Sequence, residues 1–202
     1  IPCYNEQETI YEVVSPLLKN YDVTVVDDNS SDNSKKILRK LNVRIIENTQ
    51  NHGYDRALFI GIKDSMQFKN HILITYDADG QHRKNDLDKM LNIFKRNNLD
   101  LLIGSRLNIK RFSEKLFNIY LKKKFKINDI FCGLKIYKKN ICEKYLEDFS
   151  KRSLGSLVAL KVIKLPYNFR EYQIKVNERS DKPRIGSNFL INLRILYLLM
   201  KE

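Results

Sequence analysis

Two aspartates separated by one residue, directly after a short apolar run, are the residues of this sequence best suited to chemistry. The run from Ile72 to Tyr76 leads into Asp77, Ala78 and Asp79, and Gly80 follows at once. Residues two apart in an extended chain point to the same side, so Asp77 and Asp79 are expected to project together where a strand leaves a sheet. Two such carboxylates suit a hard divalent cation, which often completes its oxygen shell with substrate phosphates. The pattern therefore indicates chemistry on a nucleotide diphosphate.

Two further polar clusters follow predicted strands. Tyr4-Asn5-Glu6 comes after the first apolar segment, and Asp27-Asp28-Asn29-Ser30 comes after the second. Either cluster by itself is explained by turn formation or helix entry, for which these residue types are favoured. Ligands of an open α/β sheet, however, bind outside the carboxyl ends of its strands. Three polar clusters at the same edge therefore favour a site in which carboxylates accept hydrogen bonds from a base or ribose.

The elements that must position these clusters alternate along the first half of the chain. Expected strands and helices follow one another, with helical apolar spacing in residues 10–18 and 55–66. The expected strands are 1–3, 23–26, 43–46, 72–76 and 99–103, and the expected helices are 10–18, 33–41, 55–66 and 86–94. This alternation predicts an α/β fold with a mostly parallel central sheet flanked by helices.

The second half is less regular. A basic helix is expected over 111–124, a strand over 131–137, a helix over 153–163 and a half-buried strand around Tyr172, Ile174 and Val176. A polar loop, 177–186, precedes an apolar stretch, 189–200. Because no repeat or linker interrupts the chain, residues 1–202 are expected to form a single domain. The chain starts at Ile1 inside an expected strand, so the domain is expected to be truncated at its N-terminus, with a C-terminal truncation left open.

Composition narrows the class of protein. With 43% hydrophobic and 30% charged residues, the 202-residue chain has the composition of a globular domain. Its net charge of +13 leaves open a basic module that binds nucleic acid or an anionic surface without catalysis. Most lysines are scattered, however, and the basic residues are not clustered with stacking aromatics in any arrangement recognised for nucleic-acid binding. The three cysteines have no paired spacing and are expected to be reduced core residues of a cytoplasmic protein.

Six short motifs in a fixed order carry a family resemblance. They are Ile1-Pro2-Cys3-Tyr4-Asn5-Glu6, Val25-Val26-Asp27-Asp28-Asn29-Ser30-Ser31-Asp32, Asn51-His52-Gly53 with Ala57 and Gly61, Asp77-Ala78-Asp79-Gly80-Gln81-His82, Gly104-Ser105-Arg106, and Asp129 with Cys132-Gly133-Leu134-Lys135. Together they resemble the family 2 glycosyltransferases of the GT-A fold, and among these the dolichyl- and polyprenyl-phosphate sugar synthases. A weaker similarity continues at Arg179 and Gly186-Ser187.

The resemblance implies a role for each matching residue. It implies that the nucleotide is framed by Pro2, Tyr4, Glu6, Val26, Asp28 and Ala78. It implies that Mg²⁺ or Mn²⁺ is bound by Asp77, Asp79 and Gln81. Donor or acceptor phosphate is then expected to contact Arg106, Arg111 and Arg179, since the guanidinium fork binds phosphate oxygens bidentately. No role follows for Tyr54-Asp55-Arg56, where relatives usually have small or basic residues, and relatives often have proline where this chain has Gln173.

The implied reaction is metal-dependent transfer of a sugar with inversion, with Asp79, Arg106 and Asp129 as catalytic residues. Donors of the GDP-mannose or UDP-glucose type are expected, and UDP-N-acetylglucosamine stays open. A glycan hydroxyl as acceptor needs a general base, for which Asp129 is the candidate. A polyprenyl phosphate is already an anion and needs none, in which case Asp129 orients other groups.

Two segments favour a lipid acceptor over a soluble one. Lys122-Lys123-Lys124-Phe125-Lys126 sets cations beside an aromatic ring, as at an anionic membrane surface. The stretch 189–200 is apolar enough to lie in an interface, and no apolar run reaches the roughly 20 residues that span a bilayer. The expected location is the cytoplasmic face of a membrane, with peripheral contact and no nucleic-acid partner. A dehydrogenase is excluded because no G-x-G-x-x-G follows the first strand, and a pyrophosphorylase because that strand is not followed by a Gly-rich, Arg-containing loop.

Overall fold

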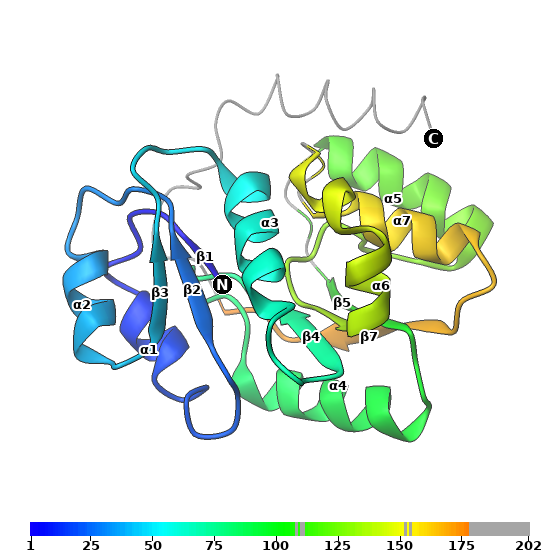
Figure 1. Ribbon diagram of the computed structural model, residues 1–202. Helices are drawn as coiled ribbons and strands as arrows, with labels where there is room; N and C mark the ends of the chain where they lie inside the picture. Colours follow the sequence, from blue (N-terminus) through cyan, green and yellow to red (C-terminus); the bar gives the residue numbers. More distant parts are fainter. Residues whose placement is uncertain (108, 110–111, 152, 154, 178–202) are drawn as a thin grey trace.

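The computed structural model describes residues 1–177 apart from 108, 110, 111, 152 and 154. Parallel strands form its first sheet, in the order β1-β2-β3. These strands are β1 (Pro2–Cys3), β2 (Thr24–Asp27) and β3 (Arg44–Glu47). Val25 and Val26 of β2 are fully buried, whereas β3 is exposed at both ends and forms the edge of this sheet. The carboxyl ends of β1 and β2 therefore open toward the same side (Figure 1).

A second sheet has the order β4-β6-β5-β7. Its strands are β4 (Ile72–Thr75), β6 (Lys135–Lys138), β5 (Leu101–Arg106) and β7 (Phe169–Ile174). Strand β6 runs antiparallel to both of its neighbours, while β5 and β7 are parallel. Among the described strands, three of the five pairings are parallel. The expected α/β class and mostly parallel pairing are therefore confirmed.

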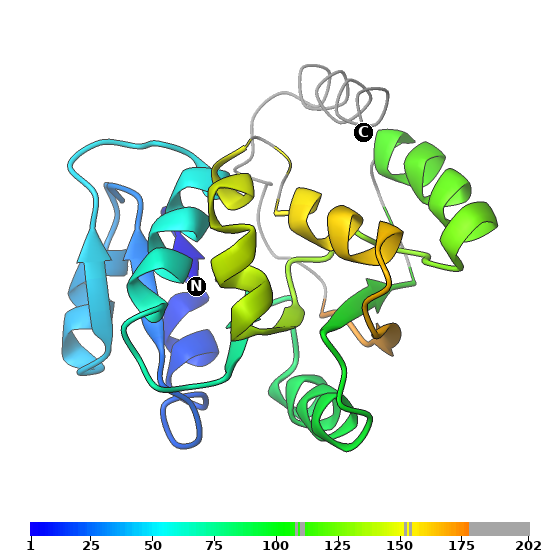
Figure 2. The same cartoon turned by 45° about the vertical axis from the view of Figure 1, so that its right-hand side comes forward.

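The helices divide into two groups, each with its own hydrophobic core (Figures 1 and 2). One group comprises α1 (Ile10–Val14), α2 (Ser34–Lys40) and α4 (Lys84–Arg96). The other comprises α3 (Tyr54–Ser65), α5 (Phe112–Phe125), α6 (Lys139–Lys144), the 3₁₀ helix η1 (Leu146–Ser150) and α7 (Leu157–Lys164). In α4 the buried stripe is Leu87, Met90 and Phe94, each at most 2% exposed, which is the helical spacing that the sequence predicts. Helices on both sides thus bury the strands that carry the polar clusters.

Several boundaries differ from those expected. The strand predicted from Phe131 begins at Lys135, and the helix predicted from Ser153 begins at Leu157. The helix predicted over 10–18 ends at Val14 and continues as turns. Helices α6 and η1 were not predicted, because their short segments lack a repeated apolar spacing. Val176 forms an isolated bridge with His82 instead of extending β7, and 178–202, including the apolar stretch 189–200, lies outside the described residues.

All three cysteines are free thiols in the interior, as expected. Cys3, Cys132 and Cys142 are each at most 2% exposed. Burial raises the pKa of Cys3 and Cys132 to about 12 and raises that of Cys142 as well. The thiols are therefore protonated and shielded at neutral pH.

A cavity of about 380 Å³ lies between the start of β1 and strand β4, beneath α3. Its apolar lining includes Ile62, Ile72 and Leu91, and neither Asp28 nor Asp77 faces it. It is therefore separate from the polar clusters. Within the described part of the chain, none of the helices has the length and apolar character needed to cross a bilayer.

Candidate active site

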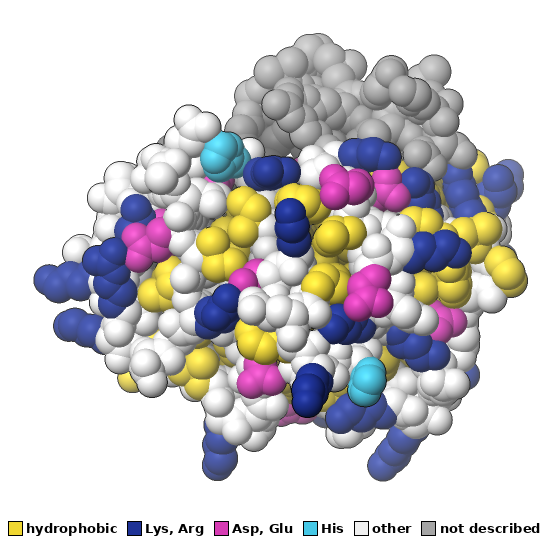
Figure 3. All heavy atoms as spheres, in the orientation of Figure 1, with side chains coloured by type: hydrophobic (Ala, Val, Ile, Leu, Met, Phe, Trp, Pro, Cys, Tyr) yellow, Lys and Arg dark blue, Asp and Glu magenta, His cyan; other side chains and the backbone are white. Residues whose placement is uncertain are grey.

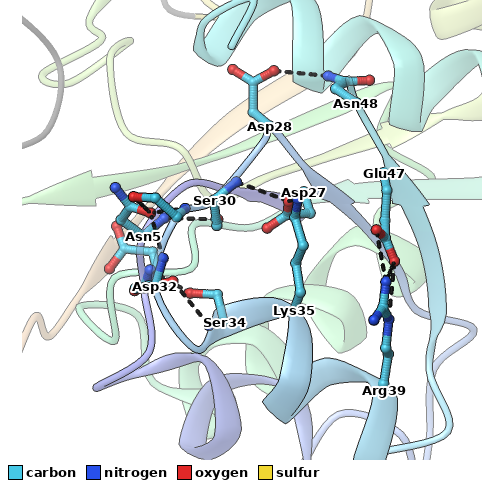
Figure 4. Close-up of polar contacts among 12 residues, drawn as sticks. Asn5, Asp27, Asp28, Ser30, Asp32, Ser34, Lys35, Arg39, Glu47 and Asn48 are labelled. Atoms are coloured by element: carbon cyan, nitrogen blue, oxygen red, sulfur yellow. Dashed lines mark hydrogen bonds and ion pairs between the residues drawn. The ribbon is translucent and has the colours of Figure 1, made fainter. Parts of the chain in front are cut away.

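The polar residues after β1 and β2 are joined by hydrogen bonds (Figure 4). The amide N–H of Asn5 donates to Ser30 Oγ at 2.9 Å, and Asn5 Oδ1 accepts from the N–H of Ser31 at 2.8 Å. Asn5 has a φ of +55°, a left-handed conformation that asparagine tolerates better than most residues. The backbone turn at Asn5 therefore fixes the first cluster against the second.

Asp27 is a structural residue at the end of β2. Its carboxylate is fully buried and accepts from the N–H of Ser30 at 3.0 Å, while Lys35 Nζ lies 3.6 Å away. These contacts close the turn into α2, which is the helix-entry role that the sequence left open.

Asp28 faces the other way, toward the segment 48–54 that leads into α3 (Figure 4). It accepts from Asn48 Nδ2 at 2.8 Å, from the N–H of His52 at 3.0 Å and from the N–H of Gly53 at 2.7 Å. Gly53 has a φ of +86° and precedes the first residue of α3, a backbone conformation that glycine adopts without cost. The loop thus holds the Asp28 carboxylate in a fixed orientation at the edge of the sheet.

The third cluster is tied to the first through Thr9. The Thr9 hydroxyl lies 2.7 Å from the carbonyl oxygen of Ala78 and 3.3 Å from Glu6 Oε2. Glu6 is itself 7% exposed, and its N–H donates to Ser34 Oγ. The structure therefore brings the three clusters together, but not at the edge of a single sheet as predicted: two of them follow β1 and β2 of the first sheet, and the third follows β4 of the second.

Asp77 is held on both of its oxygens. Tyr54 Oη lies 3.0 Å from Oδ1, and His82 Nε2 lies 3.1 Å from Oδ2. Burial opposes the charged carboxylate, but the hydrogen bonds from His82 and Tyr54 and the charge of Lys135 outweigh it and lower the pKa of Asp77 to about 2. Asp77 is therefore anionic throughout the physiological range.

Gly133 leaves the space that Asp77 needs. A Cβ atom added at Gly133 would lie 2.0 Å from Asp77 Oδ2 and 2.2 Å from Oδ1. Lys135, in the next strand, is 1% exposed and donates to the carbonyl of Cys132. Burial lowers the pKa of Lys135, and the negative charges of Asp77 and Asp129 oppose that shift.

The residues after β4 fit a divalent cation by their chemistry. The N–H of Gln81 donates to Asp79 Oδ1 at 3.1 Å, and both side chains are half-buried. The side chains of Asp77, Asp79 and Gln81 follow the carboxyl end of β4 and can bind a cation only through oxygen. Oxygen is the ligand atom that Mg²⁺ and Mn²⁺ prefer. Among the described residues, no group of three or more His, Cys, Asp and Glu side chains forms a complete metal cage. A cation here would therefore need further oxygen ligands, such as those of a diphosphate.

The half-buried Arg106 and the fully buried Asp129 form an ion pair at the end of β5. Arg106 Nε lies 2.7 Å from Asp129 Oδ2, and its Nη2 lies 3.0 Å from Oδ1. Asp129 is fully buried and also accepts from the N–H groups of Arg106 and Phe131. Glu114 of α5 accepts from the same Nη2 at 3.0 Å. Burial works against the charged guanidinium, but the hydrogen bond with Asp129 outweighs it and raises the pKa of Arg106.

The positions of the remaining predicted site residues say less about their function. Pro2 pairs in register with Val26, and both are buried. The Val26 side chain faces Gly61 of α3, so it packs in the interior. Tyr4 is half-buried in the segment that directly follows β1. Arg111 and Arg179 lie outside the described residues.

Sequence reasoning missed the residues that hold the aspartates. Two of them, His52 and Gly53, act on Asp28 through backbone N–H groups, which side-chain identity does not encode. The missed side chains are Thr9, Asn48, Tyr54, His82 as a partner of Asp77, and Glu114. Asn48 directly after β3 was the one available signal, since a polar residue there ends a strand next to Asp28.

The arrangement of the three polar clusters after β1, β2 and β4 agrees with a comparison against protein families. The model described as glycosyl transferase family 2 matches residues 1–146. The chain belongs to this family. This confirms the resemblance on which the sequence prediction rests, and the protein is a glycosyltransferase that uses a nucleotide-sugar donor.

Among curated relatives, the chain is 28% identical to the UDP-N-acetylglucosamine–dolichyl-phosphate N-acetylglucosaminyltransferase of Methanococcus voltae. The alignment covers 99% of this chain and 93% of that protein. It is 32% identical to the dolichol-phosphate mannosyltransferase of Pyrococcus furiosus over 52% of this chain and 32% of that protein.

A solved structure confirms the GT-A fold of this family 2 glycosyltransferase. Glucosyl-3-phosphoglycerate synthase from Mycobacterium tuberculosis, in complex with Mn²⁺, uridine diphosphate and phosphoglyceric acid, superposes with a TM-score of 0.76 at 12% identity. The match covers 99% of this chain and 75% of that chain.

Proposed function

We propose that this glycosyltransferase moves a sugar from a nucleoside-diphosphate sugar to a polyprenyl phosphate, with inversion at the anomeric carbon and with Mg²⁺ or Mn²⁺ as cofactor. The observation that carries the proposal is that Asp28, Asp77 and the Arg106–Asp129 pair follow β2, β4 and the β5 region of one fold. Each is held by hydrogen bonds from neighbouring segments. Base, diphosphate and acceptor phosphate are thereby given separate partners near the carboxyl ends of strands from the two sheets.

In the donor site, Asp28 accepts from the base or the ribose, and Pro2, Tyr4 and Glu6 frame it, with Val26 supporting the strand behind. Asp77, Asp79 and Gln81 hold the cation, with Ala78 spacing the two aspartates. The bound cation neutralises charge that develops on the departing nucleoside diphosphate. The low pKa of Asp77 supports this assignment, because a metal ligand must be deprotonated when the cation binds.

A UDP-sugar is the donor class best supported. The Methanococcus voltae relative has UDP-N-acetylglucosamine in its name and aligns along nearly the whole chain. The solved relative of the same fold was crystallised with uridine diphosphate and Mn²⁺. The mannosyltransferase relative aligns with about half of the chain and keeps a GDP-sugar as the alternative.

The burial and the hydrogen bonds of Asp129 support a phosphate as the acceptor. Its carboxylate is fully buried and accepts four hydrogen bonds, three from Arg106 and one from Phe131. A carboxylate engaged in this way is poorly placed to take a proton from an acceptor hydroxyl. A phosphate needs no base, so we assign Asp129 the role of orienting Arg106 toward the acceptor. Both relatives described above have dolichyl or dolichol phosphate in their names.

The outer face of α5 supports contact with a membrane surface. Leu116, Ile119 and Tyr120 are between 47% and 65% exposed, and Leu107 before the helix is 70% exposed. Exposed lysines flank this apolar stripe at positions 115, 122, 123 and 124. Helix α5 lies at the periphery of the molecule in both ribbon views (Figures 1 and 2). An apolar stripe bordered by cations is typical of a helix that lies in an anionic lipid interface, which supports our proposal that the enzyme acts at a membrane surface.

The test is transfer from radiolabelled UDP-N-acetylglucosamine, UDP-glucose and GDP-mannose to a short-chain polyprenyl phosphate, with Mn²⁺ or with EDTA. We expect a lipid-linked product from one donor, lost with EDTA and in Asp79→Asn. Phosphoglyceric acid serves as the competing acceptor. Product formed with phosphoglyceric acid and not with polyprenyl phosphate would overturn the acceptor assignment. Transfer undiminished by EDTA would overturn the cofactor assignment.

A further inference from the structure

We propose that Tyr54 is a positioning residue for the metal ligand Asp77, and that the loop Asn48–Tyr54 serves the base site and the metal site through different residues. The inference rests on the proposed function, since it concerns the same donor site. It assigns a role to Tyr54, for which neither the sequence nor the family motifs provide one.

The first part of the loop contacts the base site. Asn48 Nδ2 and the N–H groups of His52 and Gly53 converge on Asp28 within 2.7 to 3.1 Å. Asp28 is 3% exposed, so these donors set the direction in which its remaining acceptor capacity points. Removing Asn48 would therefore disturb the base site directly.

The last residue of the loop contacts the metal site. Tyr54 directly follows Gly53 and is the first residue of α3, and its hydroxyl lies 3.0 Å from Asp77 Oδ1. Oδ2 of Asp77 is opposite His82, and Gly133 leaves room for the carboxylate because it has no side chain. Outer-shell donors of this kind fix the rotamer of a ligating carboxylate and the lone pairs that it offers to the cation.

The start of α3 is rigid enough to transmit this positioning. Asp55 Oδ1 accepts from the N–H of Gly155 at 2.9 Å and from that of Ser153 at 3.3 Å. A Cβ at Gly155 would lie 3.8 Å from Tyr54 Cε1, so the ring packs against this segment. The Tyr54 hydroxyl is therefore held in place independently of Asp77.

The variant Tyr54→Phe removes the hydroxyl and keeps the ring. We expect it to weaken Mn²⁺ binding to the full chain about tenfold, the low end of the range for loss of an outer-shell partner. Binding of the metal-free nucleoside, uridine or guanosine, should not change. Mn²⁺ affinity is measured by electron paramagnetic resonance of the free ion, and nucleoside affinity by calorimetry.

The matched control is Tyr137→Phe. Tyr137 is a buried tyrosine, whereas Tyr54 is half-buried, and among the described residues the Tyr137 hydroxyl has no hydrogen-bond partner. This variant removes the same atom from a tyrosine ring that packs against Phe149 in the core, and we expect wild-type Mn²⁺ affinity. The reciprocal variant, Asn48→Ala, should weaken nucleoside binding and leave Mn²⁺ affinity within twofold.

The outcomes of these measurements distinguish a failure of the Tyr54 inference from a failure of the proposed function. If Tyr54→Phe is folded and binds Mn²⁺ as the wild type does, Tyr54 is not a positioning residue and the inference fails. An equal loss of Mn²⁺ affinity in Tyr54→Phe and Tyr137→Phe would also overturn it, because the effect would then be one of general stability. If the wild-type protein itself binds neither Mn²⁺ nor nucleotide, the proposed function fails first.

Discussion

At the scale of single residues, the donor site depends on what surrounds the two aspartates as much as on the aspartates. Gly133 is the sharpest case, because it lies behind Asp77 without contributing a side chain of its own. In Gly133→Ala the new methyl group would occupy the position of the Asp77 carboxylate, which must rotate away. We expect loss of Mn²⁺ binding and at least a hundredfold loss of activity, a cost comparable to removing a group that organises the transition state.

The measurement for Gly133→Ala is Mn²⁺ affinity by calorimetry together with the circular dichroism spectrum of the apoprotein. The spectrum should match that of the wild type, since the change is confined to a loop before β6. Wild-type Mn²⁺ affinity in a folded variant would show that Asp77 is not the ligand.

A second residue-scale prediction concerns Asp129. In Asp129→Asn the half-buried Arg106 guanidinium keeps Glu114 as a charged partner but loses its closer, fully buried carboxylate, which should lower the free energy of unfolding by about 3 kcal/mol. Because Arg106 loses its orientation, the KM for polyprenyl phosphate should rise more than the KM for the donor. Urea unfolding and steady-state kinetics measure the two effects. Loss of kcat with both KM values unchanged would instead support Asp129 as the general base.

At the scale of elements, α5 presents two different faces. Its inner face, with Phe117 and Leu121, is buried in the core, and its outer face carries Leu116, Ile119 and Tyr120 among lysines. The variant Ile119→Glu should weaken binding to phosphatidylcholine vesicles that contain phosphatidylglycerol at least fivefold, with little change in Tm. A buried carboxylate in the lipid interface is unfavourable by a few kcal/mol at most, and repulsion from anionic headgroups adds to this.

The control for this measurement is Tyr11→Glu. Tyr11 is 53% exposed on α1, at the other end of the molecule from α5 (Figure 1). Vesicle flotation should show wild-type binding for Tyr11→Glu. Equal losses in both variants would mean that net charge, and not the α5 face, governs adsorption.

The same elements show what the sequence could predict. Strands β2, β4 and β5 were predictable because apolar runs end in turn residues, and the carboxyl-end rule then predicted that Asp28 and Asp77 lie near each other, although β2 and β4 belong to different sheets. The antiparallel direction of β6 was not predictable, since an apolar run has the same composition in either direction. Its Lys135 is 1% exposed, and burial of a lysine reflects the charges around it in space and not its neighbours in sequence. The tyrosine contact with Asp77 depends on how α3 is placed, so the sequence pattern could not reveal it.

At the scale of the whole molecule, charge is spread instead of concentrated. Figure 3 shows lysines and arginines distributed over one face and interspersed with acidic side chains. Many are paired, as Arg39 is with Glu47 and Arg44 with Asp64. The net charge of +13 therefore supports attraction to anionic surfaces in general, and a dedicated nucleic-acid site would need a basic stripe with aromatic residues.

These ion pairs set the response of stability to acid. A hydrogen bond from Arg44 lowers the pKa of Asp64. Burial disfavours the charged form of three other carboxyl groups, but hydrogen bonds from lysines outweigh the burial and lower their pKa values. These groups are Asp88, Asp100 and Asp148. Groups with a depressed folded-state pKa stabilise the protein above their unfolded value of 3.8, and this stabilisation is lost as pH falls through the folded pKa. The free energy of unfolding, measured by urea titration, should be nearly constant at pH 5–7 and should fall below about pH 4. A rise in stability on acidification below pH 4 would contradict the assignment of these pairs.

The buried cysteines have a practical consequence for spectroscopy. With every native thiol protonated and inside the core, maleimides and Ellman's reagent should leave the folded chain unmodified and react fully in denaturant. One cysteine introduced on the outer face of α5 would then accept a fluorophore at a single chosen position, without removal of the natural cysteines. Because the wild-type cysteines take up no label, the immersion depth of this position in a bilayer and its distance to a labelled nucleotide become measurable on an otherwise unaltered enzyme.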